Sequence, residues 1–172
     1  MTGNVGDEWA RALLAEHGRA VRAYVARRIS PDDVDDVVVD VFVVAWRRRD
    51  AVPTDAGCRA YLLAIARRTL ANRRRSTVRR LRLEERLRRH AVPASDHPEL
   101  DAVVEALERL RPDDQEILRL TAWEGLSASE IAVVLDCTAA TAAVRLSRAR
   151  ARLRDRLQGT PPIRTSRDSK RT

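Results

Sequence analysis

Charged residues of opposite sign occupy different parts of the sequence, and each group could bind a different kind of partner. Five aspartates lie between residues 32 and 40, whereas arginines crowd residues 67–89 and 145–156. Clustered carboxylates suit a divalent cation or a basic protein surface. Clustered arginines suit phosphate groups and the edges of guanine bases. The spacing therefore predicts one surface for a protein partner and another for nucleic acid.

The overall composition also favours a polyanionic partner. The chain has 172 residues, a formal net charge of +8 and a pI near 10.9, and arginine supplies nearly all of its basic residues. A basic surface raises the local concentration of a polyanion and steers it toward the protein. A solvated surface encoded by a GC-rich genome would give the same composition, so the distribution of charge is more informative than its total.

Few residues suit metal binding, covalent cross-links or membrane insertion. The cysteines Cys58 and Cys137 and the histidines His17, His90 and His97 lack the spacing of a zinc site or a disulfide framework. The polar, acidic N-terminus lacks the features of a signal peptide, and no apolar run reaches the roughly 18 residues that span a bilayer. We therefore expect a cytoplasmic protein without a cofactor or a bound metal.

Hydrophobic periodicity predicts helices in the first part of the chain. Apolar residues recur at helical spacing in residues 10–29, 34–46 and 58–75. The middle segment is rich in valine, which favours strands, but its valines form one helical stripe, so we expect a helix there. Ser30 and Pro31 precede it and suit the N-cap and the first helical position.

Changes in composition divide the chain into two small domains. Residues 10–75 are expected to form the first domain, and the arginine-rich residues 76–97 a linker. Residues 98–158 predict four helices, and the polar residues 159–172 predict a disordered tail. The predicted fold class is all-α, with two small helical domains joined by a flexible linker.

The second domain carries the pattern of a helix-turn-helix. Ser127 and Glu130 have the spacing of a capping box, which predicts a short helix after Gly125. Residues 136–138 predict a tight turn, and Thr138 is placed to cap the helix that follows. A short helix, a turn and a second helix bearing arginines is the plan of a DNA-reading motif. A plain helical hairpin with a solvated arginine face is the alternative.

These motifs resemble two regions of the extracytoplasmic-function sigma factors of the sigma-70 family. The resemblance to region 4 rests on Glu124-Gly125-Leu126-Ser127, Glu130-Ile131-Ala132 and Arg145-Leu146-Ser147-Arg148-Ala149-Arg150. The resemblance to region 2 rests on Val34-Asp35-Asp36-Val37, Asp40-Val41-Phe42, Tyr61-Leu62 and Ile65-Ala66-Arg67. Together the matches cover roughly residues 13–157, and two motifs in the right order are more specific than either alone.

The resemblance implies a protein that binds RNA polymerase core and directs it to promoters. Residues implied to bind the polymerase β′ subunit are Asp35, Asp36, Val39 and Asp40. Residues implied to contact the −10 promoter element are Arg67, Arg68, Asn72, Arg73 and Arg74. Residues implied to contact the −35 element are Thr141, Ala142, Arg145, Arg148 and Arg152. The implied partners are the β′ and β subunits and promoter DNA, and the resemblance also allows an anti-sigma factor.

Two assignments within these regions have alternatives. Trp46 and Tyr61 are the aromatic residues near the −10 segment, and both match positions that we expect in the core rather than stacked on bases. Arg145 either reads a base or pairs with a nearby acid such as Glu130.

Two other functions compete with a sigma factor. The aspartates of residues 32–40 could bind Mg²⁺ in a nuclease, but they lack a partner histidine, a lysine base or a glycine-rich phosphate loop, so we expect no enzyme. A stand-alone helix-turn-helix regulator that acts without polymerase core is the remaining alternative. Such regulators commonly dimerise, and the sequence contains no obvious dimerisation helix or ligand pocket.

Overall fold

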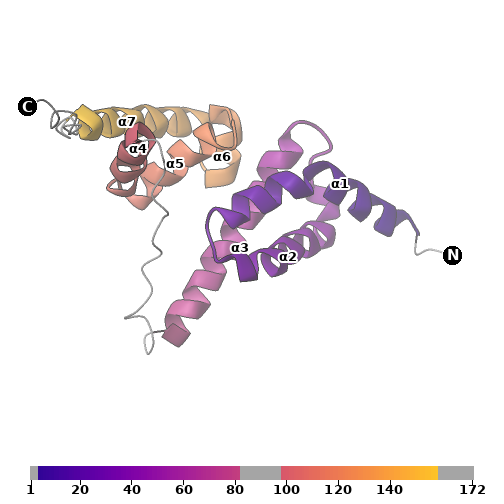
Figure 1. Cartoon of the computed structure of the whole chain (residues 1–172). Helices are drawn as coiled ribbons and strands as arrows, with labels where there is room; N and C mark the ends of the chain where they lie inside the picture. The colour runs from indigo at the N-terminus through magenta and orange to yellow at the C-terminus, as the bar shows by residue number, and fades with distance from the viewer. Residues whose placement is uncertain (1–3, 82–97, 159–172) are drawn as a thin grey trace, which may run out of the picture.

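The computed structural model describes residues 4–81 and 98–158, and all regular elements within these ranges are helical. The first range, called here the N-terminal half, contains α1 (Asn4–Ala26), η1 (Pro31–Asp33), α2 (Val34–Arg47), η2 (Arg49–Ala51) and α3 (Gly57–Leu81). The second range, the C-terminal half, contains α4 (Pro98–Glu108), α5 (Pro112–Ala122), α6 (Ala128–Leu135) and α7 (Ala139–Gln158) (Figure 1). The predicted all-α fold is confirmed.

The valine-rich segment is a helix, as its apolar spacing predicts. Val34, Val37, Val41 and Ala45 of α2 are buried, so one stripe of the helix packs against α1 and α3. Pro31 begins a short 3-10 turn before this helix. The Ser30 side chain makes no capping hydrogen bond, so the N-cap expected at Ser30 is absent.

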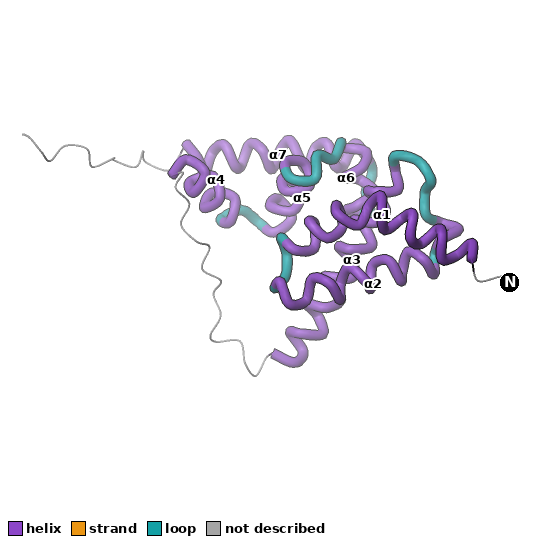
Figure 2. The backbone as a smooth tube through the Cα atoms, turned by 45° about the vertical axis from the view of Figure 1, so that its right-hand side comes forward, coloured by secondary structure: helices purple, strands orange, loops and turns teal. Residues whose placement is uncertain are grey.

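Helix α3 is buried on more than one side. Residues 62–66 are all buried because α1 and α2 cover one side of α3 and α6 covers another. Helical spacing predicts that Tyr61, Leu62, Ile65, Ala66 and Thr69 face inward. Leu63 lies outside that stripe, yet it is fully buried. The helix extends to Leu81, beyond the end predicted at Arg75, and its last turns project past the other helices (Figures 1 and 2). Residues 82–97 of the expected linker and the expected tail lie outside the described residues.

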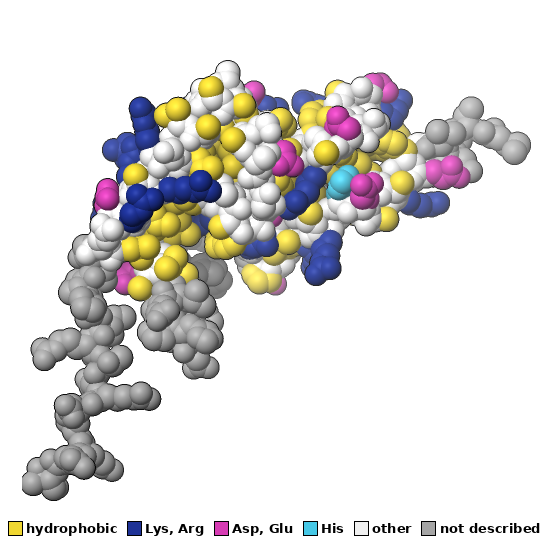
Figure 3. Space-filling view, turned by 90° about the horizontal axis from the view of Figure 1, so that it is seen from above, with side chains coloured by type: hydrophobic (Ala, Val, Ile, Leu, Met, Phe, Trp, Pro, Cys, Tyr) yellow, Lys and Arg dark blue, Asp and Glu magenta, His cyan; other side chains and the backbone are white. Residues whose placement is uncertain are grey.

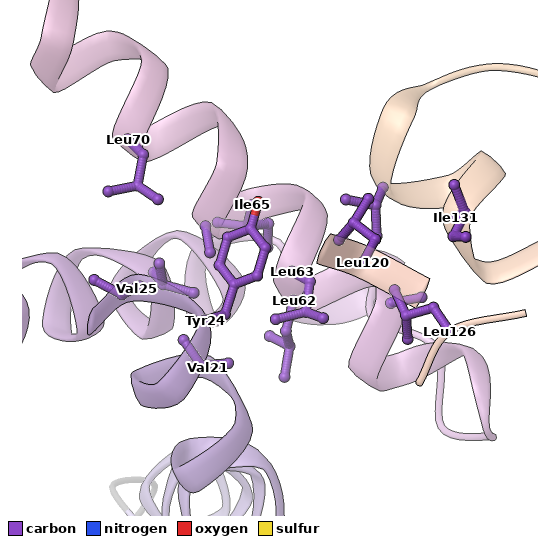
Figure 4. Close-up of a cluster of buried hydrophobic side chains, with 14 of the residues drawn as sticks. Val21, Tyr24, Val25, Leu62, Leu63, Ile65, Leu70, Leu120, Leu126 and Ile131 are labelled. Atoms are coloured by element: carbon purple, nitrogen blue, oxygen red, sulfur yellow. The ribbon is translucent and has the colours of Figure 1, made fainter. Parts of the chain in front are cut away.

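The two halves share one continuous hydrophobic core. The core cluster includes Val21, Tyr24, Leu62 and Leu63 from the N-terminal half together with Leu120, Leu126 and Ile131 from the C-terminal half (Figure 4). Because this cluster removes apolar side chains of both halves from water, the hydrophobic effect favours association of the halves. The sequence predicts two domains but does not predict that they pack against each other.

Candidate nucleic-acid and partner interfaces

The helix-turn-helix begins with the predicted capping box. The Ser127 hydroxyl accepts a hydrogen bond from the Glu130 backbone N–H at 3.3 Å, and the Glu130 carboxylate accepts one from the Ser127 backbone N–H at 2.8 Å. These bonds stabilise the charged form of Glu130 and lower the pKa of its carboxyl group. Gly125, just before the box, has a φ of 65°, the left-handed conformation that glycine adopts most readily.

A tight turn sets the angle between the two helices of the motif. Asp136 ends α6 in the left-handed conformation with a φ of 54°. Thr138 then caps α7, because its hydroxyl accepts a hydrogen bond from the Thr141 backbone N–H at 3.1 Å. Leu146 and Ala149 of α7 are buried, and α7 packs against α5 and α6. The predicted helix-turn-helix is therefore present, with the cap at the predicted residue.

The candidate DNA-reading residues of α7 differ in their surroundings. Arg145 and Arg148 are exposed, whereas Ala142 is fully buried and cannot contact a base, which corrects its assignment. Arg152 donates hydrogen bonds to both carboxylate oxygens of Asp114 on α5, at 2.8 and 3.0 Å. This pairing holds the Arg152 guanidinium against α5 of its own half.

An ion pair between Arg145 and Glu130, the alternative to base reading, is not observed. The Glu130 carboxylate bonds the hydroxyl and the backbone N–H of Ser127 instead. Arg145 lines a cleft of about 290 Å³ between the halves, and Arg67 of α3 lines the same cleft. One candidate reader of the −35 element and one of the −10 element therefore lie at a common cavity.

The basic face of α3 is partly engaged by carboxylates. Arg68 pairs with Asp136 of the helix-turn-helix at 3.1 Å. Arg73 lies within 4.0 Å of three aspartates of the N-terminal half, at 3.5 Å from Asp33, 4.0 Å from Asp36 and 3.2 Å from Asp40. Arg73 is therefore partly engaged by aspartates at the surface, and its implied role at the −10 element stays a prediction.

Other candidate −10 residues on α3 differ in exposure. Asn72 and Arg74 are exposed to solvent, and Arg67 is half-buried at the cleft. Tyr61 packs against the core, as expected, but Trp46 is 43% exposed and lies beneath the Arg49 guanidinium. The expected core position of Trp46 is therefore wrong, because the end of α2 leaves this ring uncovered.

The acidic residues of α2 border an apolar stripe. The side chains of Asp35, Asp36 and Asp40 are 75%, 76% and 53% exposed, and Asp35 pairs with Arg22 of α1. Val39, Val43 and Trp46 lie four and three residues apart and are all exposed. An exposed apolar stripe with a charged rim is the usual composition of a protein-binding surface.

Two glutamates of the C-terminal half pair with the N-terminal half. Glu116 on α5 accepts hydrogen bonds from the Tyr24 hydroxyl at 2.8 Å and from Arg28 Nε at 3.2 Å. Glu124, in the loop after α5, pairs with Arg27 at 2.9 Å and with Arg28 at 3.6 Å, and its carbonyl accepts a bond from Arg59 at 2.6 Å. Burial, together with the nearby Glu116 carboxylate, raises the pKa of Tyr24.

Comparison with known proteins identifies the family. A family model described as sigma-70 region 2 matches residues 13–80, and a model of sigma-70 region 4 matches residues 100–153. The chain is 33% identical over 169 residues to RNA polymerase sigma factor NccH of Alcaligenes xylosoxydans xylosoxydans, with 90% of each chain covered. The chain belongs to the extracytoplasmic-function sigma factors of the sigma-70 family.

Further relatives agree with this assignment. The chain is 29% identical over 170 residues to the ECF RNA polymerase sigma-E factor of Escherichia coli K12, with 89% of each chain covered. Among solved structures, CnrH in complex with the cytosolic domain of CnrY matches with a TM-score of 0.61 and 32% identity, covering 91% of each chain. The sigma factor RpoE in complex with the anti-sigma factor NepR from Bartonella quintana matches with a TM-score of 0.66 and 25% identity, covering 87% of this chain and 96% of that chain.

This sigma factor binds RNA polymerase and directs promoter-specific transcription initiation. The region 2 match accounts for the half of the molecule that a stand-alone helix-turn-helix regulator would not need, so that alternative is rejected. The family is non-catalytic, which answers the nuclease alternative. Within residues 4–81 and 98–158, no group of three or more histidine, cysteine, aspartate or glutamate side chains could hold a metal ion. No described helix is long and apolar enough to cross a membrane.

Sequence reasoning missed the residues that join the halves of this sigma factor. Glu116 and Glu124 are ordinary acids in an amphipathic segment, and their partners lie about ninety residues away in the chain. Local periodicity contains no information on pairs of that separation. The one local signal is Leu63, an apolar residue outside the predicted inward stripe of its helix.

Proposed function

We propose that this sigma factor uses three separate surfaces for polymerase, the −10 element and the −35 element. The observation that carries this proposal is the segregation of exposed charge, with carboxylates on α2 and arginines on α3 and α7. Figure 3 shows one face on which both charge signs lie among apolar side chains. Domain bounds of 10–75 for the polymerase and −10 functions and 98–158 for the −35 function fit this division.

The α2 surface is proposed to bind the β′ subunit of polymerase core. Asp35, Asp36 and Asp40 supply the charged rim, and Val39 stands at its centre with 60% of its surface exposed. A basic partner would be steered by the carboxylates and would bury the apolar stripe. Because RNA polymerase works in the cytoplasm, we assign the chain to that compartment.

The α7 surface is proposed to read the −35 element. Arg145 and Arg148 are exposed and three residues apart, which supports this proposal because arginines on one side of a recognition helix can contact base edges in the major groove. Thr141 lies one turn nearer the start of the helix, where its backbone is held by the Thr138 cap. Arg152 is left out of the base-reading set because it pairs with Asp114.

The α3 surface is proposed to contact the −10 element through Arg67, Arg68, Asn72, Arg73 and Arg74. The exposed Asn72 and Arg74 are directly accessible, whereas Arg67 lines the cleft and Arg68 is paired with Asp136. Positive side chains along one helix face suit the backbone of a separated strand.

Run-off transcription with polymerase core, followed by mapping of start sites, tests the proposal. The Asp36→Arg variant should lose core binding, because it places a positive charge where a basic partner docks. Glu8→Arg, at an exposed acid of α1, makes the same change of charge away from α2 and should transcribe like the unmodified chain. Equal activity of both variants would remove α2 from the polymerase interface.

A further inference from the structure

One large apolar side chain of the proposed −35-reading helix is exposed to solvent. Val144 of α7 is 49% exposed, whereas Leu146 is 8% exposed and Leu153 and Leu157 are half-buried. No other valine, leucine or isoleucine among the described side chains of α7 is exposed. A single exposed valine is common on protein surfaces, so its position on the helix decides whether it could serve a contact.

Val144 lies opposite the buried face of α7. It is two residues from both Ala142 and Leu146, which are buried, and a step of two residues turns an α-helix by about 200°. Arg148 follows four residues later, on the same exposed face and one turn further along. In a helix-turn-helix, the face of the second helix that points away from the core enters the major groove. Val144 therefore occupies the middle of the face that would meet base edges.

The first turns of α7 expose apolar groups rather than charges. Within residues 139–144, the exposed side chains are three alanines and Val144. The one hydroxyl group of this stretch, on Thr141, lies 2.8 Å from the Thr138 hydroxyl and is thus hydrogen-bonded at the cap of the helix. The N-terminal turns of a recognition helix lie nearest to the bases. This stretch therefore suits apolar contact with a base better than hydrogen bonding.

The major groove offers an apolar side chain one distinctive partner. Thymine presents its C5-methyl group there, whereas the other bases present hydrogen-bond donors and acceptors. A valine cannot satisfy those donors and acceptors, but it can remove a methyl group from water. We propose that Val144 is a specificity-determining residue that recognises the C5-methyl group of a thymine in the −35 element. This inference rests on the proposed role of α7 in reading that element.

The position of this thymine relative to the other contacts follows from the helix. Val144 and Arg148 are one turn apart, roughly 6 Å along the axis at 1.5 Å per residue. Base pairs in a duplex are spaced about 3.4 Å apart, so the thymine should lie within about two base pairs of the base that Arg148 contacts.

Removal of single methyl groups from the DNA tests the contact directly. RNA polymerase core carrying the full-length chain first selects its preferred −35 element from a randomised duplex. Each thymidine of that element is then replaced in turn by deoxyuridine, which lacks only the methyl group. With the unmodified chain, one replacement should weaken duplex binding about fourfold, which corresponds to ~0.8 kcal/mol for one buried methyl group.

Variants of the protein assign this methyl dependence to one side chain. Val144→Ala withdraws the apolar side chain from the groove, so the same replacement should weaken its binding less than about twofold. Its selected sequences should also show a weaker preference for thymine over cytosine at that position. Val103→Ala makes the same change at a valine of α4 that is 41% exposed, and it should keep the fourfold dependence. Because Val144 is exposed and alanine favours helices more than valine does, Val144→Ala should melt no lower than the unmodified chain.

Other results would overturn the inference. A deoxyuridine effect of the same size in Val144→Ala and in the unmodified chain would assign the methyl group to another side chain. The absence of any deoxyuridine effect, or of thymine from the selected element, would mean that no methyl group is read. A thymine more than two base pairs from the position whose preference changes in Arg148→Ala would contradict the shared face.

Selections with Arg145→Ala separate failure of this inference from failure of the proposed function. If neither Arg145→Ala nor Val144→Ala changes the selected element, then α7 does not read it and both proposals are wrong. If Arg145→Ala changes the selected element while the deoxyuridine effect is independent of Val144, α7 keeps its proposed role and only the thymine contact is wrong.

Discussion

The acidic residues of α2 and the two glutamates that join the halves have the same chemistry but different surroundings. Asp35, Asp36 and Asp40 are mostly exposed and pair with arginines at the surface. Glu116 and Glu124 are 18% and 2% exposed and pair with residues of the other half. Exposed pairs contribute little to stability and leave their charges available to a partner, whereas buried pairs are costly to break. Burial therefore separates the acids that serve binding from those that serve structure.

The largest expected effect comes from removing a buried acid that joins the halves. Glu124→Ala should lower the free energy of unfolding by up to about 3 kcal/mol, because it leaves the buried Arg28 with one carboxylate fewer. If the halves separate, Arg28 becomes exposed to water and no longer carries the cost of an unpaired buried charge. The loss of unfolding free energy therefore cannot exceed the cost of separating the halves. Asp36→Ala, at an exposed pair, should cost less than about 1 kcal/mol. Urea denaturation compares the two, and equal losses would contradict the division between buried and exposed acids.

The apolar centre of the α2 surface gives the next effect. Val39→Asn should weaken binding of polymerase core by about 2 kcal/mol, roughly thirtyfold, because the partner would bury a polar amide in place of an apolar side chain. Leu14→Asn changes a residue of α1 that is 50% exposed and should leave core affinity unchanged. Titration of labelled chain with core provides the measurement. Similar affinities for both variants would mean that the carboxylates alone form the contact.

The sequence predicts the acidic cluster of α2 but not the acids that join the halves. The aspartates of α2 are adjacent in the chain, so their clustering is visible without a structure. The capping box of Ser127 and the turn at Asp136 are also local, and both are found where the sequence predicts them. Contacts of Glu116 with Tyr24 join distant parts of the chain, and they depend on how two amphipathic units dock. Local propensity and periodicity contain no information about that docking.

The same distinction explains the residues whose expected positions were wrong. Helical spacing places Trp123 with Ile117 and Leu118 and so predicts that it faces inward. It is instead 44% exposed, and the guanidinium carbons of Arg27 and Arg119 lie 5.6 and 5.4 Å from its ring centroid. Its environment is the edge of the interface between the halves, where an aromatic face can attract cations without full burial. Ala142 shows the reverse case, because a small residue suited to close approach toward DNA packs into the core instead.

The two arginines of α7 test how pairing within the protein affects DNA binding. Arg145→Ala should weaken −35 binding by about 1.5 kcal/mol, roughly tenfold, and relax preference at one base pair. Arg152→Ala should leave sequence preference unchanged and lower thermal stability, because it leaves the largely buried Asp114 without its partner. Binding selections from a randomised −35 element measure the base preference of each variant, and thermal melts measure its stability. A narrowed or shifted base preference in Arg152→Ala would restore that residue to the reading set.

The smallest expected effect concerns acid sensitivity at the capping box. Hydrogen bonds from Ser127 lower the pKa of the Glu130 carboxyl group in the folded protein, so below the unfolded value the unfolded chain binds more protons. This contribution to stability is therefore complete above the unfolded pKa of about 4.5 and is lost as the pH falls through the folded pKa. Glu130→Gln keeps the hydrogen-bonding pattern of the box but removes the titration. Its unfolding free energy should fall less between pH 5 and pH 3 than that of the unmodified chain, by under about 1 kcal/mol. Glu105→Gln, at an exposed acid outside the box, should retain the original pH dependence, and a parallel response of the two variants would remove Glu130 as the source of the effect.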